Sequence, residues 1–236
     1  MPVLLEQVVE REGNEVGHGG QHYATTGTVH GLPPTDHRER GELIDDIGYR
    51  RFVPAEADLL AEFLTAEEWP YHADGTPSAA QIRRRAAAGD YDNDRTRTFW
   101  IITGAGAEAG LIRLLDLGDD TPLFDLRIRA AYRGQGLGTR AVRWLTGYLF
   151  TEFPGIRRIE GTTRQDNHAM RRVFRTCGYV KEAHYRQAWP APGGTVHDAV
   201  GYAILRTDWQ AGTITPPEWD DEPSPSGEQP PPRAAQ

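Results

Sequence analysis

Cysteine is almost absent from this 236-residue chain, which contains only Cys177. A single cysteine cannot form an intramolecular disulfide, so a disulfide-stabilised fold is excluded and a reducing compartment is indicated. No apolar run reaches the length of a membrane span, and the N-terminus lacks the apolar core of a signal peptide. The sequence therefore predicts a cytoplasmic protein without a membrane partner.

Positive charge is also in deficit, because the formal net charge is -8. An acidic balance disfavours nucleic acid as a partner and weakly favours cationic acceptors such as amines. The basic residues nevertheless gather in residues 127–143 and 157–175. These two stretches are either a site for a polyanionic ligand or ordinary solvated helix faces.

Both ends of the chain lack the apolar periodicity of a folded core. Residues 1–44 are rich in Gly, His and Thr, which predicts a disordered or loosely packed extension. The spacing of the histidines there matches no zinc pattern, so no metal site is predicted. Residues 211–236 are rich in proline and acidic residues and predict an extended, disordered tail. One domain, residues 45–210, is left between them.

The apolar pattern of this domain predicts the element order β-αα-βββ-α-β-α-ββ. Strands are expected at residues 47–53, 97–103, 109–117, 123–129, 158–163, 179–189 and 198–206. Helices are expected around residues 59–64, 78–89, 141–150 and 167–178. Strands and helices do not alternate throughout, which argues against a doubly wound sheet.

The most informative segment, residues 131–139, joins the fourth expected strand to the third long helix and reads Ala-Tyr-Arg-Gly-Gln-Gly-Leu-Gly-Thr. Its glycines let the backbone approach a ligand closely, and the N–H groups of the first helical turn have no partner within the helix. The positive end of the helix dipole lies beside them, and such groups bind phosphate. The predicted phosphate site consists of Arg133 as a cation and the backbone of Gly134, Gln135, Gly136, Leu137, Gly138 and Thr139.

Other glycine loops fit this segment less well. A Walker loop requires Gly-Lys-Ser/Thr, and no lysine follows Gly138. A dinucleotide fingerprint requires Gly-x-Gly-x-x-Gly, and this loop is one residue shorter, although Glu160 lies at a tolerable distance for the acidic partner. A methyltransferase loop has the same spacing but usually follows an acidic, apolar strand end. A glycine-rich turn without function is the remaining alternative.

A second segment, residues 164–179, distinguishes between these alternatives. Asn167 suits a helix N-cap, Gly178 suits a left-handed C-cap, and apolar residues between them recur at helical spacing. Taken in order, the two segments resemble the Gcn5-related N-acetyltransferase (GNAT) superfamily, and the resemblance covers about residues 46–209. The pyrophosphate motif Arg/Gln-x-x-Gly-x-Gly/Ala is met by Arg133, Gly136 and Gly138, and the later Asn-helix-Gly-Phe/Tyr motif by Asn167, Gly178 and Tyr179.

The resemblance implies a GNAT fold of the α+β class, with a mixed, mostly antiparallel sheet of six or seven strands and helices on both faces. It implies acetyl-CoA as the cofactor, with its pyrophosphate on the glycine loop. Backbone groups of Leu126, Arg127 and Ile128 would pair with the pantetheine arm as an added strand, and one N–H would polarise the thioester carbonyl. Asn167 would contact the pantetheine or phosphate arm.

Acetyl transfer needs a neutral amine, so a group near the site must accept a proton. Glu160 on the fifth strand is the first candidate and Asp125 on the fourth is the second, although either acid could simply face solvent or bind an arginine. Many relatives place a proton-donating Tyr seven residues after the Asn, where this chain has Phe174. Tyr185, Tyr132 or water could take that role, or no acid is needed.

The acceptor is expected to be a primary amine, either on a small molecule or at a protein N-terminus. Trp69, Tyr71 and His72 resemble the acceptor-side loop of the fold, although a Trp-Pro break packed on the sheet explains them equally well. The C-terminal strands resemble the branch that modifies ribosomal-protein N-termini, and relatives often form homodimers. Two alternatives stay open: a coenzyme A-binding regulatory module without catalysis, and a methyltransferase or dinucleotide enzyme.

Overall fold

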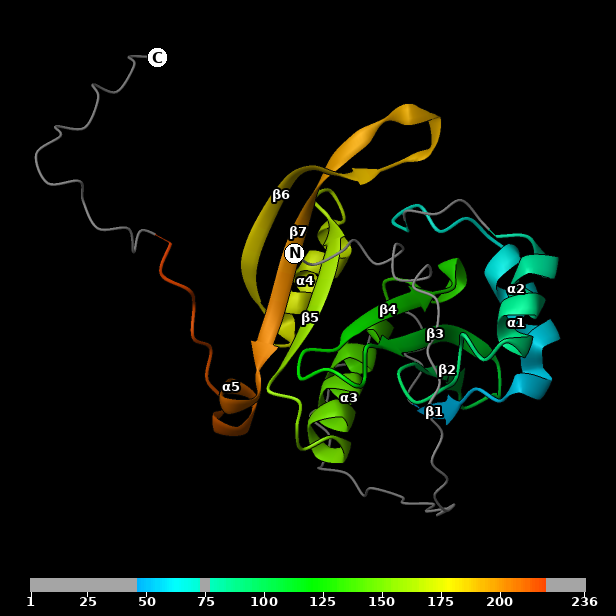
Figure 1. Ribbon diagram of the computed structural model, residues 1–236, viewed down its shortest axis with the longest axis horizontal. Coiled ribbons are helices and arrows are strands. Elements are labelled where there is room, and N and C mark those ends of the chain that lie inside the picture. Colours follow the sequence, from blue (N-terminus) through cyan, green and yellow to red (C-terminus); the bar gives the residue numbers. More distant parts are fainter. Residues whose placement is uncertain (1–45, 73–76, 220–236) are drawn as a thin grey trace, which may run out of the picture.

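A single seven-stranded sheet organises the part of the chain that the computed structural model describes, residues 46–72 and 77–219 (Figure 1). The strands are β1 (Ile47–Arg51), β2 (Arg97–Thr103), β3 (Glu108–Leu115), β4 (Leu123–Ile128), β5 (Arg158–Arg164), β6 (Val180–Pro190) and β7 (Val196–Leu205). Their order in the sheet is β1-β2-β3-β4-β5-β7-β6. All neighbours are antiparallel except β4 and β5, which are parallel.

Helices cover both faces of this sheet. They are α1 (Ala57–Thr65), α2 (Ala79–Ala87), α3 (Leu137–Glu152), α4 (His168–Thr176) and the short α5 (Arg206–Ala211), with 3-10 turns at Pro54–Glu56, Ala130–Tyr132 and Pro192–Gly194. The predicted element order and sheet are confirmed, and α5 is an addition that the sequence did not indicate. Helix α3 begins at Leu137, earlier than the expected residue 141, because the end of the glycine loop is its first turn.

Two hydrophobic cores lie on opposite faces of the sheet. Neighbouring residues of β2 show the division, because Phe99 packs in the core under α3 and α4 whereas Trp100 packs in the core under α1 and α2. Successive side chains of a strand point to opposite faces, so a strand covered on both sides reads as a continuous apolar run. The face that carries α1 and α2 is called the α1/α2 face below.

The helix ends follow the expected capping residues. Ser78 accepts a hydrogen bond from the Gln81 N–H and begins α2, and Asn167 accepts one from the Met170 N–H and begins α4. Gly178 has a φ angle of 84°, the left-handed conformation predicted for it, and Gly89 has the same φ angle after α2. These caps fix where the connections between helices and strands begin.

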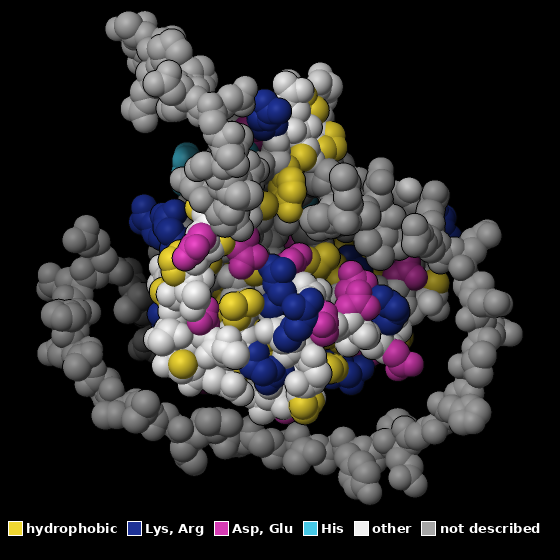
Figure 2. All heavy atoms as spheres, turned by 60° about the vertical axis from the view of Figure 1, so that its left-hand side comes forward, with side chains coloured by type: hydrophobic (Ala, Val, Ile, Leu, Met, Phe, Trp, Pro, Cys, Tyr) yellow, Lys and Arg dark blue, Asp and Glu magenta, His cyan; other side chains and the backbone are white. Residues whose placement is uncertain are grey.

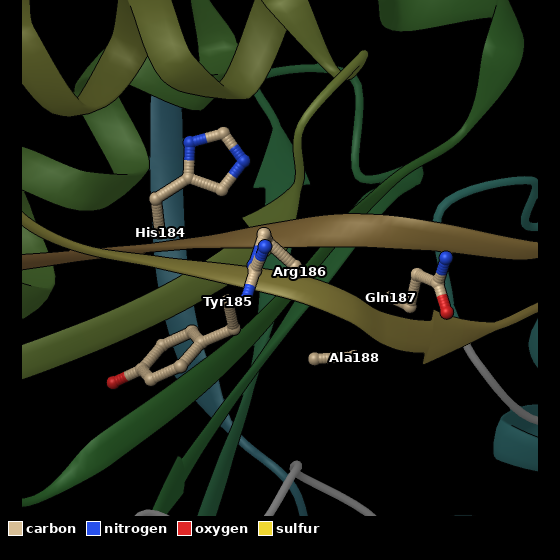
Figure 3. Close-up of a pocket in the computed structure, with 5 residues that line it drawn as sticks. All are labelled: His184, Tyr185, Arg186, Gln187 and Ala188. Atoms are coloured by element: carbon tan, nitrogen blue, oxygen red, sulfur yellow. The ribbon is translucent and has the colours of Figure 1, made fainter.

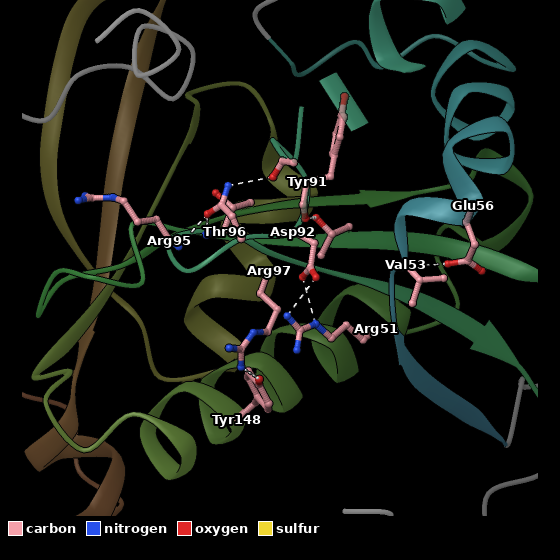
Figure 4. A network of polar contacts seen from close by, with 12 residues as sticks. Arg51, Val53, Glu56, Tyr91, Asp92, Arg95, Thr96, Arg97 and Tyr148 are labelled. Atoms are coloured by element: carbon pink, nitrogen blue, oxygen red, sulfur yellow. Dashed lines mark hydrogen bonds and ion pairs between the residues drawn. The ribbon is translucent and has the colours of Figure 1, made fainter. Parts of the chain in front are cut away.

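Polar contacts tie the β1–β2 edge of the sheet to its neighbours (Figure 4). Arg51 binds both carboxylate oxygens of Asp92 at 3.0 Å, which joins β1 to the segment after α2. Arg97 of β2 donates to the Tyr148 hydroxyl on α3. These contacts hold the edge of the sheet formed by β1 and β2.

Part of the segment expected to be a disordered tail is attached to the domain. The carboxylate of Asp208 accepts hydrogen bonds from the hydroxyls of Thr213 and Thr215 and from the Thr215 N–H. Residues 220–236, like the expected extension at residues 1–44 and its histidines, lie outside the described residues.

The surface bears charges of both signs. On the face seen in Figure 2, basic and acidic side chains are interspersed and form no large patch of one sign. Within the described ranges, no helix is long and apolar enough to span a bilayer. The same residues contain no group of three His, Cys, Asp or Glu side chains that could hold a metal ion.

Candidate functional site

Strands β4 and β5 separate almost as soon as they meet. Their parallel pairing is limited to Leu123 and Glu160, although β4 continues to Ile128 and β5 to Arg164. The Glu160 N–H donates to the Pro122 carbonyl at 3.0 Å. Beyond that point the two strands are no longer paired, so a gap opens between them in the middle of the sheet.

The backbone of Leu126 faces this gap. In an antiparallel pair, alternate residues direct their N–H and C=O groups to the same neighbour. The N–H of Arg129, the residue after β4, donates to the Ala109 carbonyl of β3, whereas the Pro122 and Ile128 carbonyls accept from Glu160 and Arg133 on the other side. The alternation therefore turns Leu126 toward β5 and Arg127 toward β3, so only part of the predicted backbone set 126–128 faces the gap.

The glycine loop ends in a helix N-terminus with no side-chain cap. The first N–H of α3 with a backbone partner is that of Arg140, which donates to Gly136, so the N–H groups of Leu137, Gly138 and Thr139 are left for a ligand. Gly134 and Gly136 have φ angles of 78° and 81°, and a Cβ on either would meet nothing within 4 Å. The loop is an open backbone cradle at the positive end of a 16-residue helix.

Arg133 is anchored at the start of the loop. Its guanidinium donates to the Ile128 carbonyl at 2.8 Å and to the Glu67 carboxylate at 3.1 Å. Glu67 also accepts from the Ala130 N–H at 2.8 Å. Arg133 thus joins the end of β4 to the segment after α1 while fixing the loop. Glu67 could not be identified from the sequence, because its partners lie more than sixty residues away and belong to no local motif.

Asn167 and Gly138 join the loop to α4. The Asn167 side chain donates to Thr163 of β5 at 3.0 Å while it caps α4. Gly138 lies where a Cβ would be 3.4 Å from the Val173 side chain, so its lack of a side chain lets α3 approach α4. Asn167 is therefore positioned at the far side of the gap from Leu126, at the end of β5.

A second group of residues surrounds Asp125 on the α1/α2 face. His72 Nε2 lies 2.9 Å from Asp125 Oδ1, and Arg127 Nε donates to Oδ2 at 3.1 Å. The Asp125 side chain is only 14% exposed. Arg113 of β3 is paired with Asp125 in the sheet register and contributes its positive charge. Two residues predicted for different roles, a candidate base and an acceptor-side residue, are therefore in direct contact.

The surroundings of Asp125 decide its protonation state. Burial alone would raise the pKa of this carboxyl, but the charge of Arg127, the bond with His72 and the charge of Arg113 hold the pKa well below its usual range. A carboxylate held so strongly in its ionised form is a poor proton acceptor. Because Asp125 bonds to both His72 and Arg127, it fixes the positions of these two side chains.

Trp69 and Tyr71, in the same segment as His72, pack beside this group. Trp69 is buried against Phe63, and its indole N–H donates to the Leu64 carbonyl at 3.0 Å. This is the packed Trp-Pro break that the sequence allowed as an alternative. Arg164 of β5 lies 4.8 Å from the centre of the Tyr71 ring and donates to the Pro70 carbonyl.

A third group contains Glu160 and Tyr185. Arg158 lies 2.9 Å from Glu160 and also binds Glu182, so one guanidinium serves two half-buried carboxylates. Tyr185 on β6 is near them: burial and then the charge of Glu160 raise the pKa of its hydroxyl, which keeps its proton at neutral pH. The two carboxylates carry one more charge than Arg158 neutralises. This excess negative charge lies where β4 and β5 meet, which is called the narrow end of the gap below.

Phe174 lies in the core at the position where many relatives carry Tyr. Its ring is 1% exposed and stacks on Tyr202 with ring centroids 4.7 Å apart. It also packs directly beneath Gly161 of β5. The hydrocarbon ring is therefore used for packing, and Tyr132 lies apart in the 3-10 turn before the loop.

An open hollow of about 700 Å³ lies on β6 and shares Tyr185 with the third group. It is lined by residues 184–188, and Figure 3 shows His184 and Tyr185 on opposite sides of the strand. His184 is 44% exposed and binds Asp198 at 2.7 Å. The pair has the same chemistry as His72 and Asp125 but lies at the surface.

A mixed sheet that parts between two parallel strands, next to an uncapped helix and a glycine loop, defines an acyltransferase of the GNAT class. Residues 46–180, more than half of the chain, match the family model described as an acetyltransferase (GNAT) domain. The chain belongs to this family and is an N-acetyltransferase, a class of enzymes that generally uses acetyl-CoA. The sheet topology rules out the doubly wound fold of a dinucleotide enzyme.

Solved structures with similar folds are acetyltransferases. A chimera of the spermidine N-acetyltransferase SpeG from Vibrio cholerae and hSSAT has a TM-score of 0.62 at 17% identity, covering 70% of this chain and 98% of that chain. The spermidine/spermine N-acetyltransferase SpeG from Vibrio cholerae with manganese ions has a TM-score of 0.60 at 16% identity, covering 72% and 98%. A probable acetyltransferase has a TM-score of 0.57 at 24% identity, covering 70% and 96%. No curated protein sequence matches the chain. At these identities the likeness concerns the fold alone.

Proposed function

We propose that this N-acetyltransferase takes acetyl-CoA as donor and a cationic primary amine as acceptor. Acetyl-CoA supplies an activated acetyl group on a thioester. The open cradle at residues 134–139, whose N–H groups lack partners at a helix N-terminus, fits its pyrophosphate. The Leu126 N–H, facing the gap, is suited to stabilise negative charge on the thioester oxygen. Asn167 stands at the other side of the gap to bind the pantetheine arm.

Arg133→Glu is expected to weaken acetyl-CoA binding by about 10- to 100-fold, the value of one or two charge-assisted hydrogen bonds. The new carboxylate would oppose Glu67 and release both the Ile128 carbonyl and the start of the loop. Isothermal titration with acetyl-CoA measures the effect. Arg83→Glu is the matched control, because Arg83 also forms an ion pair but with the exposed Asp58 on the α1–α2 side. Equal affinity in both variants would refute the placement of the pyrophosphate.

The charge around the narrow end of the gap supports a cationic acceptor. Glu160 and Glu182 exceed the charge of Arg158 by one, and the whole chain is acidic. An ammonium group is attracted to such a site. Similar folds act on spermidine, as their names state, and a polyamine carries the charges that this site would attract. A protein N-terminus, as in the branch that modifies ribosomal proteins, is the other acceptor with a suitable amine.

Glu160→Gln is expected to raise the KM for the amine about fivefold, which corresponds to about 1 kcal/mol for one charge near the surface. The acetyl-CoA affinity should stay unchanged, and the effect should shrink at high salt. Glu152→Gln removes a charge at the far end of α3 and serves as the control. A fall in kcat at constant KM would instead assign proton removal to Glu160, the role that the sequence suggested first.

The deciding experiment for this function has two parts. Isothermal titration tests stoichiometric binding of acetyl-CoA. Thiol release is then measured with three amines: spermidine, butylamine and a lysine-free tetrapeptide with a free N-terminus. Turnover with any of them confirms transfer, and a preference for spermidine confirms the charged acceptor. Tight binding without turnover would identify a coenzyme A-binding module, and no binding by the folded protein would refute the proposal.

Two further proposals concern the surroundings of the enzyme. The absence of cysteine pairs in the sequence supports a cytoplasmic location. A homodimer is proposed from the family resemblance, and one solved structure of similar fold is described as a dodecamer. Light scattering of the purified protein tests the assembly.

A further inference from the structure

His72 lies over the gap between β4 and β5, held from both sides. Its Nε2 bonds to Asp125 of β4, and the residues just before it are held by Arg164 of β5, which donates to the Pro70 carbonyl at 3.2 Å and stacks on Tyr71. The backbone of Leu126, next to Asp125 in the chain, faces the same gap. The imidazole therefore contacts Asp125, the residue that precedes Leu126, whose N–H would receive the acyl oxygen.

The second ring nitrogen of His72 has no partner. Nδ1 is buried, and no hydrogen-bond donor or acceptor reaches it. A buried polar atom without a partner costs about 1 to 3 kcal/mol, so its presence calls for an explanation, and a catalytic role is one. In the described part of the chain, the other buried side-chain atoms of this kind are Nε atoms of Arg97, Arg113 and Arg158, which can only donate. Of this group, His72 Nδ1 alone can accept a proton.

Asp125 determines which nitrogen carries that lone pair. The ionised carboxylate accepts only, so a neutral imidazole must donate through Nε2–H and leave Nδ1 unprotonated. The carboxylate is fixed in turn by Arg127 and faces Arg113, and Trp69 lies edge-on to the ring with centroids 6.2 Å apart. This is the arrangement of a general base with an orienting acid. Two further arginines near this segment are already paired, Arg164 with Asp166 and Arg133 with Glu67.

We propose that His72 is the general base of the acetyl transfer and that Asp125 positions it. This inference rests on the proposed function and assigns the proton-accepting group of the same site. His72 Nδ1 takes one proton from the acceptor ammonium, and the electron pair of the broken N–H bond stays on the nitrogen. That nitrogen forms the new N–C bond as the C–S bond breaks, and the sulfur leaves with its electron pair. The nitrogen then gives its second proton to the thiolate, which yields the neutral amide and the coenzyme A thiol. The proton on His72 passes to solvent.

His72→Gln tests the assignment, because the amide can still donate to Asp125 but cannot accept a proton. We expect kcat to fall about 100-fold or more, with the acetyl-CoA Kd and the amine KM within about twofold of the parent values. His184→Gln is the matched control, since it removes the exposed histidine of the His184–Asp198 pair and should leave kcat unchanged. The amine is the one of the three above with the highest kcat/KM.

The outcomes separate this inference from the proposed function. If the parent protein acetylates the amine and His72→Gln retains kcat within fivefold, the inference is overturned while the function stands. A loss expressed only as a higher KM also overturns it. If His72→Gln no longer binds acetyl-CoA, turnover by His72→Ala is measured with added imidazole. Recovered turnover supports His72 as the base, and a lack of recovery overturns the assignment.

Discussion

Asp125→Asn is expected to lower the free energy of unfolding by about 3 to 5 kcal/mol, the usual cost of removing one partner from a buried ion pair. The side chain keeps its shape but loses its charge, so Arg127 and Arg113 face each other without the carboxylate between them. Denaturant unfolding followed by circular dichroism measures the change. The variant should also lose kcat, because nothing would then fix the proton on Nε2 of His72.

Asp92→Asn is the matched control for this prediction. Asp92 also accepts two hydrogen bonds from an arginine, but Arg51 is 50% exposed. Exposed pairs contribute under about 1 kcal/mol, so the control should be nearly neutral. Equal losses in the two variants would show that the charges around Asp125 do not stabilise the fold as a buried group.

The difference in stability between the parent protein and Asp125→Asn should decrease as the pH falls. The pKa of Asp125 is lower in the folded protein than the ordinary value of about 3.9 in an unfolded chain. Its stabilisation is therefore fully present above about pH 4 and is lost as the pH falls toward the folded value. The parent protein's advantage over Asp125→Asn should shrink below about pH 4, whereas a constant advantage would contradict the ionised state of Asp125.

The local parts of the site could be predicted from the sequence because they rest on short-range rules. The glycine loop, the caps at Ser78 and Asn167, and the strand that precedes the loop are each determined by residues within a few positions. The element order followed from the same local patterns. The start of α3 was misplaced because glycines disfavour helix, although the first turn tolerates them when its N–H groups serve a ligand.

The partners of the site residues could not be predicted, because they depend on register and on long-range contacts. Glu67 reaches Arg133 across sixty-six residues, and His72 reaches Asp125 across fifty-three. The pairing of Arg113 with Asp125 becomes visible only when the β3–β4 register is known. For that reason the sequence offers Asp125 as a candidate base, whereas its contacts with Arg127, Arg113 and His72 are visible only in the structure.

Gly161→Val is expected to lower the free energy of unfolding by about 3 kcal/mol or more, because the core cannot accept a side chain there. A Cβ at this position would lie 2.6 Å from the Phe174 ring and 3.2 Å from Phe124. The melting temperature should fall by about 6 to 12 °C for a domain of this size. Gly147→Ala is the control: its Cβ would meet nothing within 4 Å, and alanine in a helix interior should stabilise α3 by about 0.5 to 1 kcal/mol.

A double-mutant cycle with Phe174→Leu identifies the cause. If the clash with the ring is responsible, Gly161→Ala should cost less in the Phe174→Leu background than alone, with a coupling of about 1 kcal/mol or more. Additive effects would place the strain elsewhere.

The contact between Phe174 and Gly161 also explains the departure from the family at residue 174. The ring carbon that would carry a tyrosine hydroxyl, Cζ, is one of the atoms closest to Gly161, so the hydroxyl would press against β5. The close packing of α4 against β5 therefore favours phenylalanine at residue 174. Any proton transfer in this enzyme must use other residues.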